Sequence, residues 1–147
     1  MSKAMQWSNI NKYLEGEPTD LLEVFFLDLS ASSWKDLFIW MSDRVIVLDC
    51  QFGRLNIDEL NVESFLNGSM SYVAHIKGSS GIELSISAID ECEASIDVEI
   101  ESINNEESFR VFLENISEIS RVIHCKKYIV CQEFKREKPF IVNGVLV

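Results

Sequence analysis

The chain has 147 residues, of which 13 are Lys or Arg and 24 are Asp or Glu, so its formal net charge at pH 7 is −11. Hydrophobic residues make up 47% of the chain, which is typical of a folded protein, and the length fits one domain over residues 1–147. The acidity argues against a nucleic acid or an anionic membrane as the partner, because either would require a basic surface.

Export and membrane insertion are not expected from the sequence. Charged residues interrupt the longest apolar run, residues 21–29, which is far shorter than the roughly 20 residues of a membrane-spanning helix. Residues 1–7 lack the long apolar stretch of a secretory signal. We therefore expect a cytoplasmic protein whose four cysteines, Cys50, Cys92, Cys125 and Cys131, are reduced thiols.

The first third of the chain predicts two helices with a strand between them. The helical spacing of its apolar residues predicts a short helix over residues 8–15. Residues 21–29 are rich in β-branched and aromatic residues and favour a buried strand, although periodicity leaves a helix open. Ser33, followed by Asp36, predicts the N-cap of a helix over residues 33–43.

The middle of the chain predicts mainly strands. A strand is expected over residues 45–52, and Asn61 is expected to cap a short helix that ends at Leu66. Residues 70–77, 82–88 and 93–101 follow, and the last two alternate strictly between apolar and polar side chains. Such alternation indicates strands with one buried and one solvated face, and the short turns between them predict an antiparallel meander.

A long amphipathic helix over residues 105–123 and two strands over residues 127–134 and 139–146 complete the prediction. The pair Asn143-Gly144 favours a tight turn, but so few residues follow it that we expect a bend rather than a hairpin. The predicted fold is therefore α+β. It is a single domain with a mainly antiparallel sheet of about six strands and two to four helices packed on one face.

The charge is unevenly distributed along the sequence. Residues 1–82 carry a net charge of −5, whereas residues 83–118 contain eleven acids and a single base, Arg110, for a net charge of −10. Residues 119–147 contain six bases and two acids, for a net charge of +4. The protein is thus electrically polarised along its sequence.

The acids of residues 93–101 fall on the polar face of a predicted strand, where side chains repeat about every 6.6 Å. Such a row predicts a docking surface for a basic protein partner, with electrostatic steering of the encounter. The alternative is a solvated face with no partner. Trp40 lies about 120° around its predicted helix from the apolar Trp34, and it is expected either to pack on the sheet edge or to stay partly exposed. An exposed Trp40 would be a candidate interface anchor. The candidate partner-binding residues are Glu83, Glu93, Asp97, Glu99, Glu101 and Trp40.

No pattern in the sequence indicates catalysis, a cofactor or a metal. Phosphate-binding glycine motifs and the G-x-S-x-G motif are absent, and Cys125 and Cys131 are too far apart for the usual zinc pair. His75 in a strand is more simply a structural residue than a general base. The basic run Lys135-Arg136-Glu137-Lys138 is more simply a solvated turn than a phosphate site.

A small acidic α+β protein without catalytic motifs resembles the bacterial immunity proteins, which bind and inhibit a toxin domain, often a basic nuclease. The resemblance is one of size, charge and fold class, and no matching motif assigns residues. It implies a non-enzymatic inhibitor. The alternatives are a secretion chaperone or other small acidic adaptor, an enzyme with an unrecognised site, and a homodimer in which acidic and basic segments of two copies pair.

Overall fold

Alternating apolar and polar residues form a nine-stranded sheet in the computed structural model, which describes residues 5–147. All neighbouring strands are antiparallel, in the order β3-β2-β4-β5-β6-β1-β7-β8-β9. The strands are β1 (Leu21–Phe26), β2 (Val45–Cys50), β3 (Gly53–Leu55), β4 (Tyr72–Lys77), β5 (Glu83–Asp90), β6 (Glu93–Glu99), β7 (Tyr128–Gln132), β8 (Ile141–Val142) and β9 (Val145–Leu146). Residues 21–26 are thus a strand, and the β4-β5-β6 meander is confirmed.

The expected number of strands, about six, was too low. The additional strands are two or three residues long, which is too short to show a period-two pattern. The bend expected at Asn143 is a true hairpin between β8 and β9, in which Val142 pairs with Val145. Asn143 (φ 53°) and Gly144 (φ 84°) both adopt the left-handed conformation that a two-residue hairpin turn requires.

The predicted helices are all present, with small shifts of their ends. The α-helices are α1 (Trp7–Ile10), α2 (Ala31–Met41), α3 (Val62–Leu66) and α4 (Glu106–Val122). The 3₁₀ helices are η1 (Asn11–Leu14), η2 (Ile57–Glu59), η3 (Ser79–Gly81) and η4 (Ile100–Ile103). Helix α2 begins earlier than expected, because Ser30 is its N-cap and Ser33 completes the capping box. Asn61 and Asn105 cap α3 and α4 as predicted.

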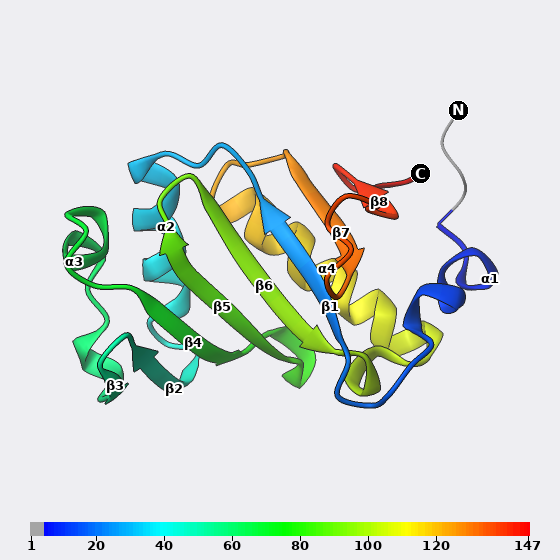
Figure 1. The fold of residues 1–147 in the computed structure, drawn as a ribbon, viewed down its shortest axis with the longest axis horizontal. Helices are drawn as coiled ribbons and strands as arrows, with labels where there is room; N and C mark the ends of the chain where they lie inside the picture. The colour runs from blue at the N-terminus through cyan, green and yellow to red at the C-terminus, as the bar shows by residue number, and fades with distance from the viewer. Residues whose placement is uncertain (1–4) are drawn as a thin grey trace.

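Helices α2 and α4 cover one face of the sheet, while α1 and α3 lie at opposite ends of the molecule (Figure 1). The core lies between these two layers. The inward residues of β1 are fully buried against α4, whose inward face contributes Phe112, Ile116 and Ile119. None of the helices in residues 5–147 is long and apolar enough to cross a membrane. No helix of residues 5–147 covers the opposite face of the sheet, which is called the open face below.

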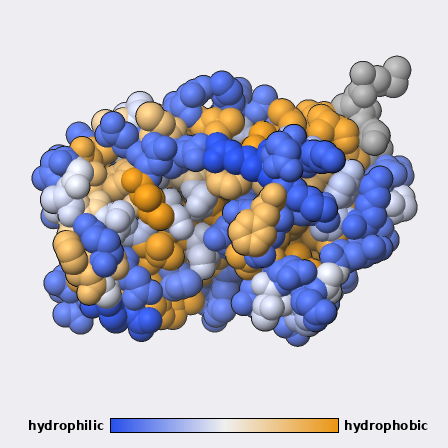
Figure 2. Space-filling view, viewed as in Figure 1, coloured by the Kyte–Doolittle hydropathy of each residue, from blue (hydrophilic) through white to orange (hydrophobic). Residues whose placement is uncertain are grey.

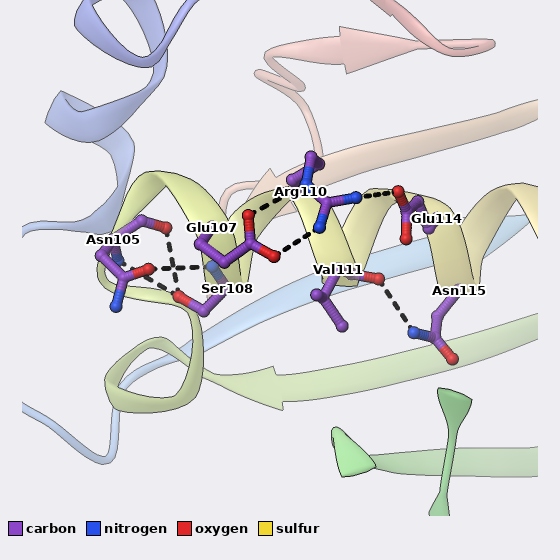
Figure 3. Close-up of polar contacts among 7 residues, drawn as sticks. All are labelled: Asn105, Glu107, Ser108, Arg110, Val111, Glu114 and Asn115. Atoms are coloured by element: carbon purple, nitrogen blue, oxygen red, sulfur yellow. Dashed lines mark hydrogen bonds and ion pairs between the residues drawn. The ribbon is translucent and has the colours of Figure 1, made fainter. Parts of the chain in front are cut away.

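One buried polar residue joins α4 to the turn that connects β4 to β5. Asn115 is almost fully buried, and its Oδ1 accepts a hydrogen bond from the backbone N–H of Ser79 at 2.9 Å. Its Nδ2 donates to the backbone carbonyl of Ser79 and to that of Val111, and Figure 3 shows the bond to Val111. This contact fixes α4 against the strand pair whose outer side forms part of the open face.

Candidate functional site on the open face of the sheet

Strand register places a row of mostly polar side chains across the open face. The row runs over six neighbouring strands and consists of Val47, His75, Ser85, Asp97, Glu23 and Cys131. Because alternate residues of a strand point to opposite faces, these side chains lie opposite the buried core residues. Figure 2 views this face and shows hydrophilic side chains interspersed with apolar patches.

Three of the predicted docking residues line one hollow of about 420 Å³ on this face. Glu83, Asp97 and Glu99 contribute carboxylates, and His75 and Ser85 contribute further polar atoms. Lys77 lies opposite Glu83 in the register, but no ion pair joins them among the described residues. Within residues 5–147 the three carboxylates have no cationic partner, so the hollow is negatively charged.

Asp97 is the most buried of these three acids. Burial, together with the nearby carboxylates of Glu23 and Glu133, raises its pKa to about 6. Its Oδ1 atom is buried and accepts no hydrogen bond from the residues that the structure describes. A buried carboxylate oxygen without a hydrogen bond lowers the stability of the free protein. A hydrogen-bond donor or a cation from a partner would remove this cost.

The β7–β8 loop, residues 133–140, folds over the other end of the open face. Arg136 donates two hydrogen bonds to Glu93 on β6, and its guanidinium lies 4.2 Å from the ring centroid of Phe25 on β1. The backbone N–H of Phe134 donates to Glu23 Oε1 at 3.0 Å. The basic run Lys135-Arg136-Glu137-Lys138 is therefore not simply a solvated turn, because Arg136 pairs with an acid of β6 and partly neutralises that strand within the same chain.

The other three predicted docking residues, Glu93, Glu101 and Trp40, do not line this hollow. Glu93 lies on the open face but is paired with Arg136. Glu101 leaves the face, because β6 ends at Glu99 and the chain turns into η4. Trp40 is only 6% exposed, and Arg44 stacks on its ring at 4.4 Å, so the expectation of an exposed tryptophan anchor is wrong. Helix α2 packs on both the sheet and α4, so more of the helix surface is buried than its apolar spacing predicted.

Sequence reasoning missed Glu23 and Glu133, which reach the same cluster from outside the acidic segment. Glu23 pairs directly with Asp97 in the register of β1 and β6. Its only signal in the sequence was a charge within a run of apolar residues, which in a central strand must point to the solvated face. The acidic segment itself is also divided, because its helical acids Glu106, Glu107, Glu114 and Glu118 lie on α4, behind the sheet.

No catalytic arrangement is evident among the described residues. His75 Nδ1 and Ser85 Oγ are 2.7 Å apart, but Asp97 lies beyond Ser85 in the row rather than beside His75. A nucleophile–base pair is normally completed by a group that orients the base. All four cysteines are free thiols, and residues 5–147 contain no cluster of potential metal ligands.

Comparison with known proteins gives one similarity in fold. No protein-family model matches the sequence, and no curated protein is significantly similar to it. Among solved structures, the chain is similar to a chain in the crystal structure of the toxic C-terminal tip of CdiA from Pseudomonas aeruginosa in complex with immune protein. The TM-score is 0.58 with 16% identity, and the match covers 87% of this chain and 97% of that chain. At this identity the similarity shows that the two chains share a fold.

Proposed function

We propose that this chain is an immunity protein, a non-enzymatic inhibitor that binds a basic toxin domain through the open face of its sheet. The observation that carries the proposal is a carboxylate cluster on that face, none of whose members has a cationic partner among the described residues: Glu23, Glu83, Asp97 and Glu99. The fold, shared with a chain of a toxin–immune protein complex, supports the same role. The net charge of −11 favours the inhibitor side of such a pair when the toxin is basic.

The geometry suggests how such an inhibitor would act. Clustered carboxylates create a negative potential that steers a basic surface toward the hollow and raises the association rate. On contact, Lys or Arg side chains of the toxin would pair with Glu83, Asp97 and Glu99, which have no cationic partner among the described residues. The basic groove through which a nuclease binds its substrate would then be occupied by protein.

The test begins with the gene directly upstream of the gene for this chain, whose product we expect to contain a basic toxin domain. Growth of cells expressing that toxin is measured with and without this chain, and the purified pair is titrated from roughly 50 to roughly 300 mM NaCl. We expect protection of growth and an affinity that falls with added salt. Absence of both protection and binding would reject the immunity role.

A matched pair of variants locates the binding face. The first, Glu83→Gln with Asp97→Asn and Glu99→Gln, neutralises the hollow. The second neutralises the same number of charges on α4, at Glu106, Glu114 and Glu118. We expect the first variant to lower the association rate about tenfold and to flatten the salt dependence, and the second to change both only slightly. Equal effects of the two variants would show that net charge, and not this face, determines binding.

A further inference from the structure

Phe134 is the most exposed large hydrophobic residue described, with 87% of its surface accessible. It lies on the β7–β8 loop, at the border of the open face. A single exposed apolar residue needs no explanation by itself. Three further observations set Phe134 apart: its backbone conformation, the contacts that hold it there, and the charges around it.

The backbone at Phe134 is in the left-handed region, with φ of 61°. It is the third residue of a turn closed by the N–H of Lys135, which donates to the carbonyl of Gln132 at 3.0 Å. Glycine or asparagine normally occupies such a position, because a large side chain is strained there. Folding alone would favour glycine, so an aromatic residue at this position is a cost to stability that a function can explain.

The side chain is also presented on a fixed loop. The N–H of Phe134 donates to Glu23 Oε1, and two residues later Arg136 is joined to Glu93 and stacks on Phe25. These contacts attach the loop to β1 and β6, two neighbouring strands of the open face. A group held in place before binding loses less conformational entropy when a partner arrives.

The surroundings of Phe134 are acidic. A second hollow, of about 350 Å³, is lined by Phe134 together with Glu15, Asp20 and Glu133, with Lys135 as its one base among the described residues. Leu21 lines both this hollow and the first, so the two adjoin. Acids outnumber the base three to one in this hollow, and an exposed aromatic side chain beside such charged groups is the arrangement of an interface anchor with a charged rim.

We propose that Phe134 is the aromatic anchor of the partner interface, and that it inserts into an apolar pocket ringed by Lys and Arg on the toxin domain. The inference rests on the proposed function, and it adds the residue that would hold the complex together once charge has brought the partners into contact. Charges at a rim act mainly on association, whereas a buried anchor acts mainly on dissociation.

The test compares Phe134→Gly, Phe134→Ala and Phe52→Ala for binding to the same toxin domain and for unfolding in urea. Phe52 is the matched control, since it is 82% exposed but lies in the turn between β2 and β3, at the other edge of the sheet. Phe134→Gly removes the ring and suits the left-handed backbone, so we expect it to unfold at an equal or higher urea concentration than the wild type. We expect its affinity for the toxin to fall at least tenfold, through faster dissociation, while Phe52→Ala binds as the wild type does.

The outcomes separate this inference from the proposed function. Wild-type binding that Phe134→Gly leaves within twofold, or that Phe52→Ala weakens equally, would overturn the anchor and leave the immunity role standing. Failure of the wild type to bind or protect would overturn both. Sedimentation of the free chain tests a second copy as the occupant: a dimer that Phe134→Gly converts to a monomer would also overturn the assignment to a toxin.

Discussion

Arg136 and Glu93 are 43 positions apart in the sequence, yet they form an ion pair with two hydrogen bonds on the open face of the sheet. Nη1 of Arg136 donates to Oε1 of Glu93 at 2.7 Å, and Nη2 donates to Oε2. The most basic segment of the chain is thereby joined to its most acidic strand. The pair removes Glu93 from the charge available to a partner and holds the β7–β8 loop against the face that carries the carboxylates.

Replacement of Arg136 by lysine tests this role of the pair. Lysine keeps the charge but loses the two parallel hydrogen bonds and the planar stacking on Phe25, so we expect the loop to loosen. The pair is partly exposed, and its loss should lower the free energy of unfolding by only about 1 kcal/mol. Hydrogen exchange at the amides of Phe134 and Lys135 should accelerate more than global stability predicts.

Arg54→Lys is the control, because Arg54 pairs with Asp49 in the β2–β3 hairpin and does not touch the loop. It should leave exchange at Phe134 unchanged. Unaltered exchange at Phe134 in Arg136→Lys would show that the loop is held in place without this ion pair.

A second prediction concerns the contact that Asn115 of α4 makes with the β4–β5 turn. Asn115→Ala removes a buried side-chain amide and its three hydrogen bonds to the backbone of Ser79 and Val111, which should cost about 2 to 3 kcal/mol of stability. Urea denaturation measures the loss, and Asn104→Ala, a change at an exposed asparagine, should cost much less.

The same contact requires a glycine at position 78. A Cβ atom on Gly78 would lie 2.3 Å from Oδ1 of Asn115, so Gly78→Ala should also destabilise the protein. Because both changes disrupt one contact, the double variant should lose less stability than the sum of the single losses. Strict additivity in this cycle would show that the two residues act independently.

The sequence predicted the fold well where local periodicity was strong. The alternation of residues 82–88 and 93–101 gave β5 and β6, and the apolar stripe of residues 105–123 gave α4. The number of strands was underestimated, because strands of two or three residues such as β3 and β9 form through pairing with neighbouring strands and show no pattern of their own.

The candidate site was only partly predictable, for the same reason. Glu83, Asp97 and Glu99 were identified from one segment, and the structure brings them to one hollow. The contributions of Glu23 and Arg136 depend on which strands are neighbours, which a single sequence does not reveal. Likewise, summing charge over residues 83–118 joined acids that the fold places on opposite sides of the sheet.

A third prediction concerns the cysteines. Cys131 is fully buried beside Glu23, and burial, with that carboxylate second, raises the pKa of its thiol to about 11. Cys92 is exposed. At pH 8 a thiol-specific reagent should modify Cys92 quickly and Cys131 only after unfolding, because the thiolate is the reactive form. Mass spectrometry of the modified peptides checks the order, and rapid labelling of Cys131 in the native protein would contradict it.

The last prediction concerns Asp97, whose position on the open face should cost stability at neutral pH. The raised pKa, about 6, means that the folded protein binds this proton more tightly than the unfolded chain does. The stabilisation is therefore complete below about pH 4 and is lost as the pH rises through 6. Asp97→Asn should match the wild type at low pH and exceed its stability above pH 6, by about 1 kcal/mol once solvent screening of the partly exposed carboxylate is allowed for.

Urea unfolding from pH 4 to pH 8 measures that difference, and Asp90→Asn, a change at an exposed acid of the β5–β6 hairpin, provides the control. If Asp97 binds a basic partner, Asp97→Asn should be more stable than the wild type on its own and should bind the toxin domain more weakly. A residue kept for binding at the expense of stability would behave in this way. An Asp97→Asn protein that is less stable than the wild type at pH 8 would instead make Asp97 a structural residue.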